Sequence, residues 1–290
     1  MNPDLQGGAF LRSNREFTSY NSLEAVFRTR QSRNFSLQAN YAFSHSYLSN
    51  TYTLRNDPVA TLNTGVEGGV THTLKLYGGV ELPFGKGKRF AGNANRFVDA
   101  LIGGWNVNMT ANLQSGRLID FGNVRLVGMS KGEFRSAYKL RFDDAGRKVY
   151  MLPQDIIDNT VKAFSTSATS LTGYGSLGAP SGRYLAPANG PDCIGIADTA
   201  IYGANFGYEG CGEGELVVTG PTFKTVNLGI SKSFRVKGDM RFDFSAQLYN
   251  AFNWANFTPV GTASNATTAY EVTGLSDSPR VAELILRFTW

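Results

Sequence analysis

The side chains that most often carry catalysis or bind metals are scarce in this chain. It has two histidines, His45 and His72, and two cysteines, Cys193 and Cys211. The histidines fall in different candidate strands, and neither belongs to a recognisable constellation with a serine, cysteine or carboxylate. Metal binding by the cysteines is disfavoured because no histidine lies near them. We therefore predict no catalytic residue, no cofactor-binding residue, no metal site and no enzymatic activity.

Two further motifs have more ordinary interpretations. Cys193 and Cys211 lie in one Gly-rich segment, and a disulfide is favoured over two unpaired thiols if the segment faces an oxidising compartment. In the loop-entropy model such a disulfide would stabilise by about 3 kcal/mol. Gly85-Lys86-Gly87-Lys88 resembles a phosphate-binding loop, but its spacing from Gly79 does not fit the nucleotide motif, so we interpret it as a basic turn.

Composition limits the class of protein. Hydrophobic residues make up 42% and charged residues 18% of 290 residues, which excludes a disordered tail and a charged coiled coil. The net charge of +5 is spread along the chain, so nucleic-acid binding is not expected. Aromatic residues (12%) and 33 glycines suit many strands joined by turns. No apolar stretch approaches the ~18–20 residues of a membrane-spanning helix, and residues 1–4 do not resemble a secretory signal.

The strongest pattern is alternation of apolar and polar side chains, which is typical of β-strands with two different faces. In the fourth candidate strand Trp105, Val107, Met109, Ala111 and Leu113 alternate with asparagine, threonine and glutamine. Seven segments show this pattern: 20–30, 34–46, 73–82, 105–114, 225–234, 240–249 and 282–290.

The pattern fits a membrane barrel better than a soluble β-sandwich. The apolar faces extend over four or five alternate positions, close to the ~9–11 residues of a membrane-spanning strand, whereas strands in sandwiches average ~5–6 residues. The polar faces favour asparagine, glutamine, serine and threonine, as a water-filled lumen would. Lys232 interrupts the apolar face of its strand near one end, where its long side chain could reach the membrane interface.

The lengths of the connections predict a topology. The connections at 31–33 and 236–239 are short, whereas 49–69, 119–220 and 253–278 are long. Outer-membrane barrels have short periplasmic turns and long extracellular loops. With the C-terminus in the periplasm, counting strands backwards places both short turns on the periplasmic side and all three long connections outside. The link at 83–99 is periplasmic by this count yet rather long.

The predicted strands number seven, which is odd, whereas bacterial single-chain barrels have an even number. An open edge is also costly in lipid, so we expect part of a larger closed sheet or an additional strand near residues 8–13. Residues 153–164 predict a short helix with Ile157, Val161 and Phe164 on one face. This helix could contact substrate as a lid, but packing of the long loop onto the barrel mouth is the favoured interpretation.

The last strands carry two further candidate features. Leu284, Leu286, Phe288 and Trp290 resemble the β-signal that the barrel-assembly machinery recognises, because an apolar edge strand with a terminal aromatic can pair with another strand. An ordinary last strand with an interfacial aromatic residue would look the same. Four charged residues should project into the lumen, where a cross-strand charge ladder would control register more than bind a ligand: Arg241, Asp243, Glu283 and Arg287.

Several stretches in a fixed order resemble TonB-dependent receptors, most closely the Oar-like barrels. They are Ile102-Gly103-Gly104-Trp105 to Leu113-Gln114-Ser115-Gly116, Gly220-Pro221 to Ser231-Lys232-Ser233-Phe234, Leu248-Tyr249-Asn250-Ala251-Phe252-Asn253, Pro279-Arg280, and Tyr150-Met151-Leu152-Pro153-Gln154-Asp155-Ile156-Ile157-Asp158-Asn159-Thr160. The resemblance extends from about residue 14 to residue 290. It depends on the order and spacing of these stretches, since no single motif is specific.

The resemblance implies a barrel of about 22 strands in a Gram-negative outer membrane, with a plug that couples to TonB. We therefore expect an all-β, antiparallel transmembrane β-barrel segment of about seven or eight strands, residues 1–290, with a long extracellular loop at 119–220 and no plug domain. The expected function is uptake of an unidentified nutrient, energised through TonB in the full-length protein. Expected partners are outer-membrane lipid, the barrel-assembly machinery, the nutrient ligand and, only through the missing plug, the TonB complex. The alternatives are a passive outer-membrane pore or structural barrel, and a secreted carbohydrate-binding β-sandwich.

Overall fold

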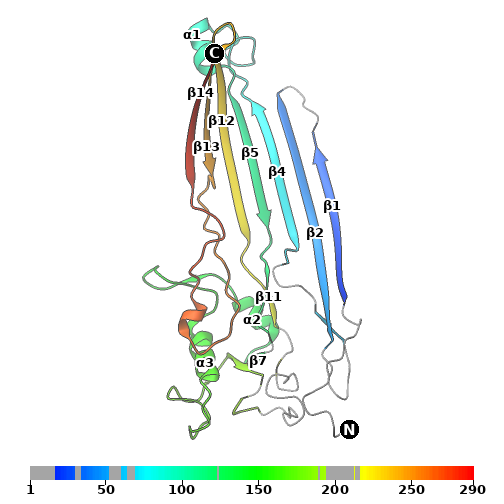
Figure 1. Cartoon of the computed structure of the whole chain (residues 1–290), viewed down its shortest axis with the longest axis vertical. Helices are drawn as coiled ribbons and strands as arrows, with labels where there is room; N and C mark the ends of the chain where they lie inside the picture. Colours follow the sequence, from blue (N-terminus) through cyan, green and yellow to red (C-terminus); the bar gives the residue numbers. More distant parts are fainter. Residues whose placement is uncertain are drawn as a thin grey trace.

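A single antiparallel sheet runs along most of the molecule (Figure 1). The computed structural model describes residues 17–29, 34–51, 60–63, 69–122, 124–188, 190–193, 212 and 216–290. The sheet has eight strands, namely β1 (Phe17–Arg28), β2 (Phe35–Thr51), β3 (Ala60–Asn63), β4 (His72–Glu81), β5 (Asn106–Gln114), β12 (Phe223–Lys237), β13 (Met240–Tyr249) and β14 (Val281–Thr289).

The sheet is a meander in which neighbouring long strands follow one another along the chain. Its order is β1-β2-β4-β5-β12-β13-β14, with the short β3 paired to β2. All seven predicted strands are confirmed, and the first begins at Phe17 rather than at residue 20. Within the described part of the chain β1 and β14 each pair on one side only, so the sheet is open. The possible strand near residues 8–13 lies outside the described residues.

The register of the sheet joins the predicted apolar faces of all seven strands. Residues directly opposite one another in an antiparallel pair project from the same face. One row across four strands pairs Leu76 with Ala111, Ala111 with Val226, and Ala39 with Leu76. Farther along the sheet, Leu286 lies opposite Phe244 and Leu284 opposite Ala246. The alternation seen strand by strand in the sequence therefore produces one continuous apolar surface.

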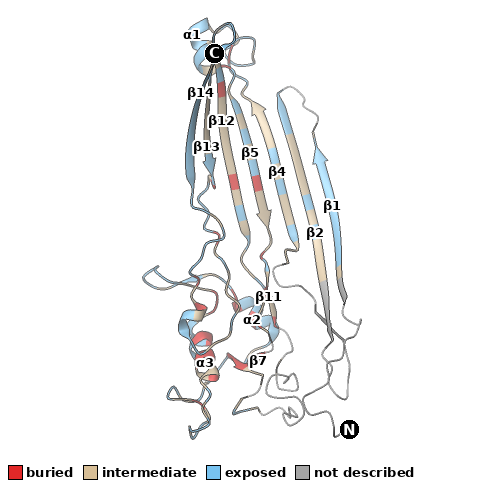
Figure 2. Ribbon diagram, in the orientation of Figure 1, coloured by how far each residue is buried: buried red, intermediate tan, exposed pale blue. Residues whose placement is uncertain are grey.

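No second sheet covers this apolar surface in the described residues, and most of its apolar side chains are partly or largely exposed, although Ala111 and Val226 are buried. Leu284 is 74% exposed and Leu286 is 69% exposed, although both are large and apolar. Burial is instead concentrated beyond one end of the sheet (Figure 2). A β-sandwich would bury these side chains between two facing sheets, so the arrangement does not favour the sandwich alternative.

The two ends of the sheet differ as the connection lengths predicted. The described parts of the connections after β2, β5 and β13 lie at the lower end in Figure 1, whereas the C-terminus and the connections after β4 and β12 lie at the upper end. We call these the loop end and the turn end. At the turn end β12 and β13 are joined through Gly238, which has φ +56°. The link between β4 and β5 contains α1 (Arg96–Ile102), which the sequence did not predict.

The loop end contains most of the remaining secondary structure. The connection from β5 to β12 carries α2 (Lys131–Ala137) and α3 (Gln154–Phe164), and the connection from β13 to β14 carries the 3-10 helix η1 (Thr267–Tyr270). Three small antiparallel pairs accompany them: β6 (Leu118–Asp120) with β11 (Val217–Thr219), β7 (Val124–Val127) with β10 (Tyr184–Pro187), and β8 (Arg141–Phe142) with β9 (Val149–Tyr150). The helix predicted at 153–164 is confirmed as α3.

Candidate functional site

Two long connections fold together into what we call the loop-end domain: the described residues of 118–187 with 216–219 and 256–276. Its core draws side chains from both connections, and sixteen of them are buried: Ile119, Phe121, Val124, Phe134, Ala137, Tyr138, Met151, Leu152, Ile156, Ile157, Val161, Leu185, Leu216, Val218, Tyr270 and Val272. Because segments more than a hundred residues apart share one core, these connections form a folded domain rather than independent loops.

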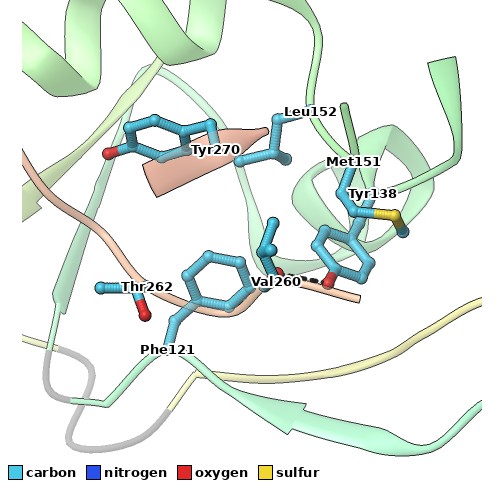
Figure 3. A pocket seen from close by; sticks show the side chains of 7 residues that line it. All are labelled: Phe121, Tyr138, Met151, Leu152, Val260, Thr262 and Tyr270. Atoms are coloured by element: carbon cyan, nitrogen blue, oxygen red, sulfur yellow. Dashed lines mark hydrogen bonds between the residues drawn. The ribbon is translucent and has the colours of Figure 1, made fainter. Parts of the chain in front are cut away.

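A hydrogen bond from Tyr138 joins the two connections beside a cluster of aromatic rings in the first of them (Figure 3). The ring of Phe121 meets those of Phe134 and Tyr138 edge-on, with centroids 5.2 and 5.7 Å apart. The Tyr138 hydroxyl donates to the carbonyl oxygen of Val260 at 2.5 Å, and burial raises the pKa of Tyr138 above its usual value. The space enclosed by these residues is too small for a water molecule, so it is packed interior and not a ligand site.

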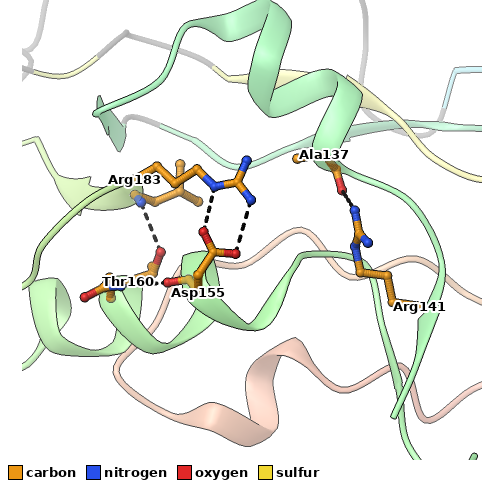
Figure 4. Close-up of polar contacts among 7 residues, drawn as sticks. Ala137, Arg141, Asp155, Thr160 and Arg183 are labelled. Atoms are coloured by element: carbon orange, nitrogen blue, oxygen red, sulfur yellow. Dashed lines mark hydrogen bonds and ion pairs between the residues drawn. The ribbon is translucent and has the colours of Figure 1, made fainter. Parts of the chain in front are cut away.

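Hydrogen bonds to α3 hold β10 and the adjacent Arg183 in place within the domain (Figure 4). Thr160, fully buried on α3, accepts a hydrogen bond from the backbone N–H of Leu185 at 3.0 Å. Nearer the surface, Arg183 Nε and an Nη donate to the two carboxylate oxygens of Asp155 at 2.6 and 3.2 Å. This bidentate bond to Arg183 lowers the pKa of Asp155. The face predicted from Ile157 and Val161 is buried in the core of the domain itself.

Replacing Thr160 with valine is expected to destabilise the loop-end domain by about 1–3 kcal/mol, because the buried N–H of Leu185 loses this acceptor while side-chain volume is kept. Amide hydrogen exchange at Leu185 should accelerate accordingly. The matched control is Thr169→Val, since Thr169 is exposed and such surface changes usually stay within about 0.5 kcal/mol. Equal exchange in both variants would contradict a stabilising role for the Thr160 bond.

One open pocket of about 590 Å³ lies on the surface of this domain and offers a candidate ligand site. It is lined by Ser130, Gly132, Glu133, Ser136, Ala137, Arg141, Pro153 and Arg183. Ser130 and Glu133 form a capping box that begins α2, and the hydrogen bonds from Ser130 lower the pKa of Glu133. The Arg141 guanidinium donates to the Ala137 carbonyl at 3.4 Å. Two guanidinium groups and a carboxylate at one rim suit a polar ligand with hydrogen-bonding groups.

The residues of this pocket were not predicted from the sequence. The Ser-x-x-Glu pattern at Ser130 and Glu133 is a recognised start signal for a helix and could have located α2. Arg141 and Arg183 carry no local signal, because they come together only through the packing of α2, α3 and the β7–β10 pair.

The predicted β-signal residues occupy the edge strand and the chain end beside it. Leu284, Leu286 and Phe288 alternate on the apolar face of β14, and the rings of Phe288 and Trp290 lie 5.9 Å apart. Recognition by the assembly machinery stays a prediction.

The four charged residues proposed as a ladder are not one continuous row. Asp243 accepts from Arg241 at 3.2 Å within β13 and lies opposite Arg287 on β14. Glu283 lies farther along β14 and accepts from the Tyr249 hydroxyl at 3.2 Å. The arrangement therefore joins β13 to β14 at two separate places.

Cys193 and the histidines occupy separate regions. The backbones of Gly190 and Cys193 pair in an isolated antiparallel β-bridge. Cys211 lies outside the described residues, so the disulfide between Cys193 and Cys211 stays a prediction. His72 contacts the Tyr41 hydroxyl through Nδ1 at 2.9 Å, and its ring lies 5.2 Å from that of Phe43. His72 thus belongs to an aromatic cluster on the sheet.

In the part of the chain that the structure describes, no group of three or more histidine, cysteine, aspartate or glutamate side chains is placed to hold a metal ion. The described helices include none that is long and apolar enough to cross a membrane.

Comparison with known proteins assigns the family. Neither the curated protein sequences nor the solved structures gave a match. A family model described as "Outer membrane beta barrel domain" matches residues 3–283, which is nearly the whole chain. This agrees with the antiparallel meander and its continuous, exposed apolar face and places the protein in the outer membrane. The chain belongs to the outer membrane beta barrel domain family.

Proposed function

We propose that this chain is part of an outer-membrane receptor that takes up a nutrient and is energised through TonB in the full-length protein. The observation that carries the proposal is the loop-end domain, in which two distant connections share a core and present an open pocket of about 590 Å³. A passive pore requires no such domain, whereas a receptor needs a stable surface to capture a scarce ligand before transport. The resemblance of the chain to Oar-like receptors supports the same function.

The open edges of the sheet support membership of a larger barrel. In lipid each unpaired backbone N–H or C=O costs several kcal/mol, so β1 and β14 need partner strands beyond those described. The remaining partners in this proposal are the barrel-assembly machinery, which would read β14, and the TonB complex, which would act through a plug domain. The polar rim of Glu133, Arg141 and Arg183 favours a ligand with hydrogen-bonding groups over an apolar one.

Energy dependence separates a receptor from a pore. Cells that produce the full-length protein would be offered a panel of labelled oligopeptides and oligosaccharides, and uptake would be measured with and without TonB. We expect uptake of at least one compound that stops when TonB is deleted or the proton-motive force is collapsed. Uptake that continues without TonB, together with stable ion conductance in planar bilayers, would instead support the passive pore.

A deletion tests the loop-end domain separately from the barrel. A side chain at Gly128 would collide with the carbonyl of Gly182, so these two glycines lie in contact at the end of the β7–β10 pair. Removing residues 129–181 and joining Gly128 to Gly182 should keep membrane insertion, because no strand of the main sheet is cut. We expect this variant to lose TonB-dependent uptake. Unchanged uptake would show that ligand capture lies elsewhere.

A further inference from the structure

The link between β4 and β5 holds an apolar helix face open to the surroundings at the turn end. In α1 the side chain of Phe97 is 84% exposed and that of Leu101 is 71% exposed, with Val98 also exposed beside them. Leu101 lies four residues after Phe97 and three after Val98, and residues three and four apart lie on the same side of a helix, so the three side chains form one stripe. No residue of α1 is buried. An exposed apolar stripe of this kind is typical of a surface that contacts a membrane or another apolar partner.

The helix is fixed in place even though its apolar stripe is open. At its start the Asn95 side chain accepts from the N–H groups of Phe97 and Val98 at 3.1 and 2.9 Å. At its end the Trp105 indole donates to the carbonyl of Leu101 at 2.8 Å, and Lys232 Nζ donates to that of Ala100 at 2.5 Å. A frayed segment could hide its apolar side chains by rearranging. Here bonds at both ends hold the stripe outward.

Lys232 and Trp105 attach α1 to the apolar face of the sheet. Lys232 lies on the same face of β12 as Ile230 and Phe234, yet it is only 5% exposed. Its Nζ lies 5.5 Å from the ring centroid of Trp105 and 4.8 Å from that of Phe234. The Trp105 ring meets Phe244 of β13 edge-on at 5.9 Å. The helix therefore stands where the lipid-facing surface of the barrel ends (Figure 1).

The same link carries positive charge next to its apolar side chains. Four basic residues, Lys86, Lys88, Arg89 and Arg96, occur with a single acidic residue, Asp99, between residues 83 and 105. Lys88 is paired with Glu81 at 2.9 Å, while the other three cations are exposed. Asp99 accepts from the backbone N–H of Lys86. Cations beside exposed aromatic and aliphatic side chains are the composition of segments that bind at the surface of anionic lipid.

We propose that the β4–β5 link, residues 83–105, is an interfacial membrane anchor that binds phospholipid at the membrane surface at the turn end. Phe97, Val98 and Leu101 enter the boundary between headgroups and acyl chains, while Arg89 and Arg96 face the phosphate groups. Phe84 and Phe90, whose rings lie 5.5 Å apart, add a second apolar contact. This binding fixes the depth of the turn end in the membrane. It requires the barrel to lie in a membrane but does not depend on the receptor function.

Fluorescence of a new tryptophan tests whether α1 meets lipid. The full-length protein carrying Phe97→Trp is reconstituted in phosphatidylcholine vesicles, and the emission of the parent protein is subtracted. We expect the added emission to be quenched by phosphatidylcholine brominated near the headgroup and protected from acrylamide. The matched control is Leu171→Trp, because Leu171 is fully exposed at the loop end and should show the opposite pattern. Unchanged heat-modified gel mobility confirms that both variants fold.

Two results would overturn the proposal. The first is that Phe97→Trp emission is quenched by acrylamide and not by brominated lipid, as expected for Leu171→Trp. The stripe would then face water, as a surface for a protein partner would. The second concerns the cations: spin-labelled phosphatidylglycerol should quench Phe97→Trp more strongly than spin-labelled phosphatidylcholine at equal mole fraction. Adding Arg89→Gln and Arg96→Gln should reduce this preference about fivefold for each arginine removed. A preference that is absent, or that survives loss of both arginines, would contradict binding of anionic headgroups.

Discussion

Leu286→Arg is expected to lower the stability of the membrane-inserted protein by about 2–4 kcal/mol, because it places a guanidinium near mid-depth of the hydrocarbon. Leu286 lies near the middle of β14, opposite Phe244, on the continuous apolar face, and is 69% exposed there. Its neighbours in lipid are acyl chains, which cannot solvate a charge. Urea unfolding from lipid vesicles, followed by heat-modified gel mobility, measures the loss.

The matched control lies one residue away in the same strand. Ile285 projects from the other face, opposite Ser245, so Ile285→Arg introduces the same side chain at nearly the same depth but on the polar side. We expect it to cost less than about 1 kcal/mol, since the guanidinium can remain hydrated there. If both variants lose equal stability, or Ile285→Arg loses more, the assignment of the two faces is wrong.

Phe134→Ala is expected to destabilise the loop-end domain by about 3–5 kcal/mol without unfolding the main sheet. Phe134 is fully buried on α2, and its ring packs against Phe121 and Tyr138. Truncation removes this contact area and leaves a cavity among residues from two chain segments. Hydrogen-exchange mass spectrometry should find faster exchange in peptides from 118–187 and 256–276, with peptides from β4, β5, β12 and β13 unchanged.

Leu171→Ala supplies the comparison for this prediction. Leu171 is also a large apolar residue of the same domain, but it is fully exposed, so its loss should change stability by no more than about 0.5 kcal/mol. Faster exchange that spreads into the main sheet would mean that the domain and the barrel unfold as one unit. Undisturbed exchange throughout would mean that the shared core does not hold the two connections together.

The amino-acid sequence by itself determined the strands and their faces. A strand places successive side chains on opposite sides, so each apolar face can be read from a local run such as Trp105 to Leu113. The lengths of the connections separated a turn end from a loop end, and the structure has the same arrangement. The helix at 153–164 was predicted because its apolar period is also local.

Only the tertiary structure decided how the connections fold. The core of the loop-end domain joins Phe121 and Tyr138 to Val260 and Tyr270, which are more than a hundred residues away, and no local period marks such partners. Lys232 illustrates the same limit. In the sequence it was an interruption of an apolar face, whereas in the structure its ammonium group binds the end of α1. Contacts between distant segments depend on how whole elements pack, and that information is not contained in the neighbours of a residue along the chain.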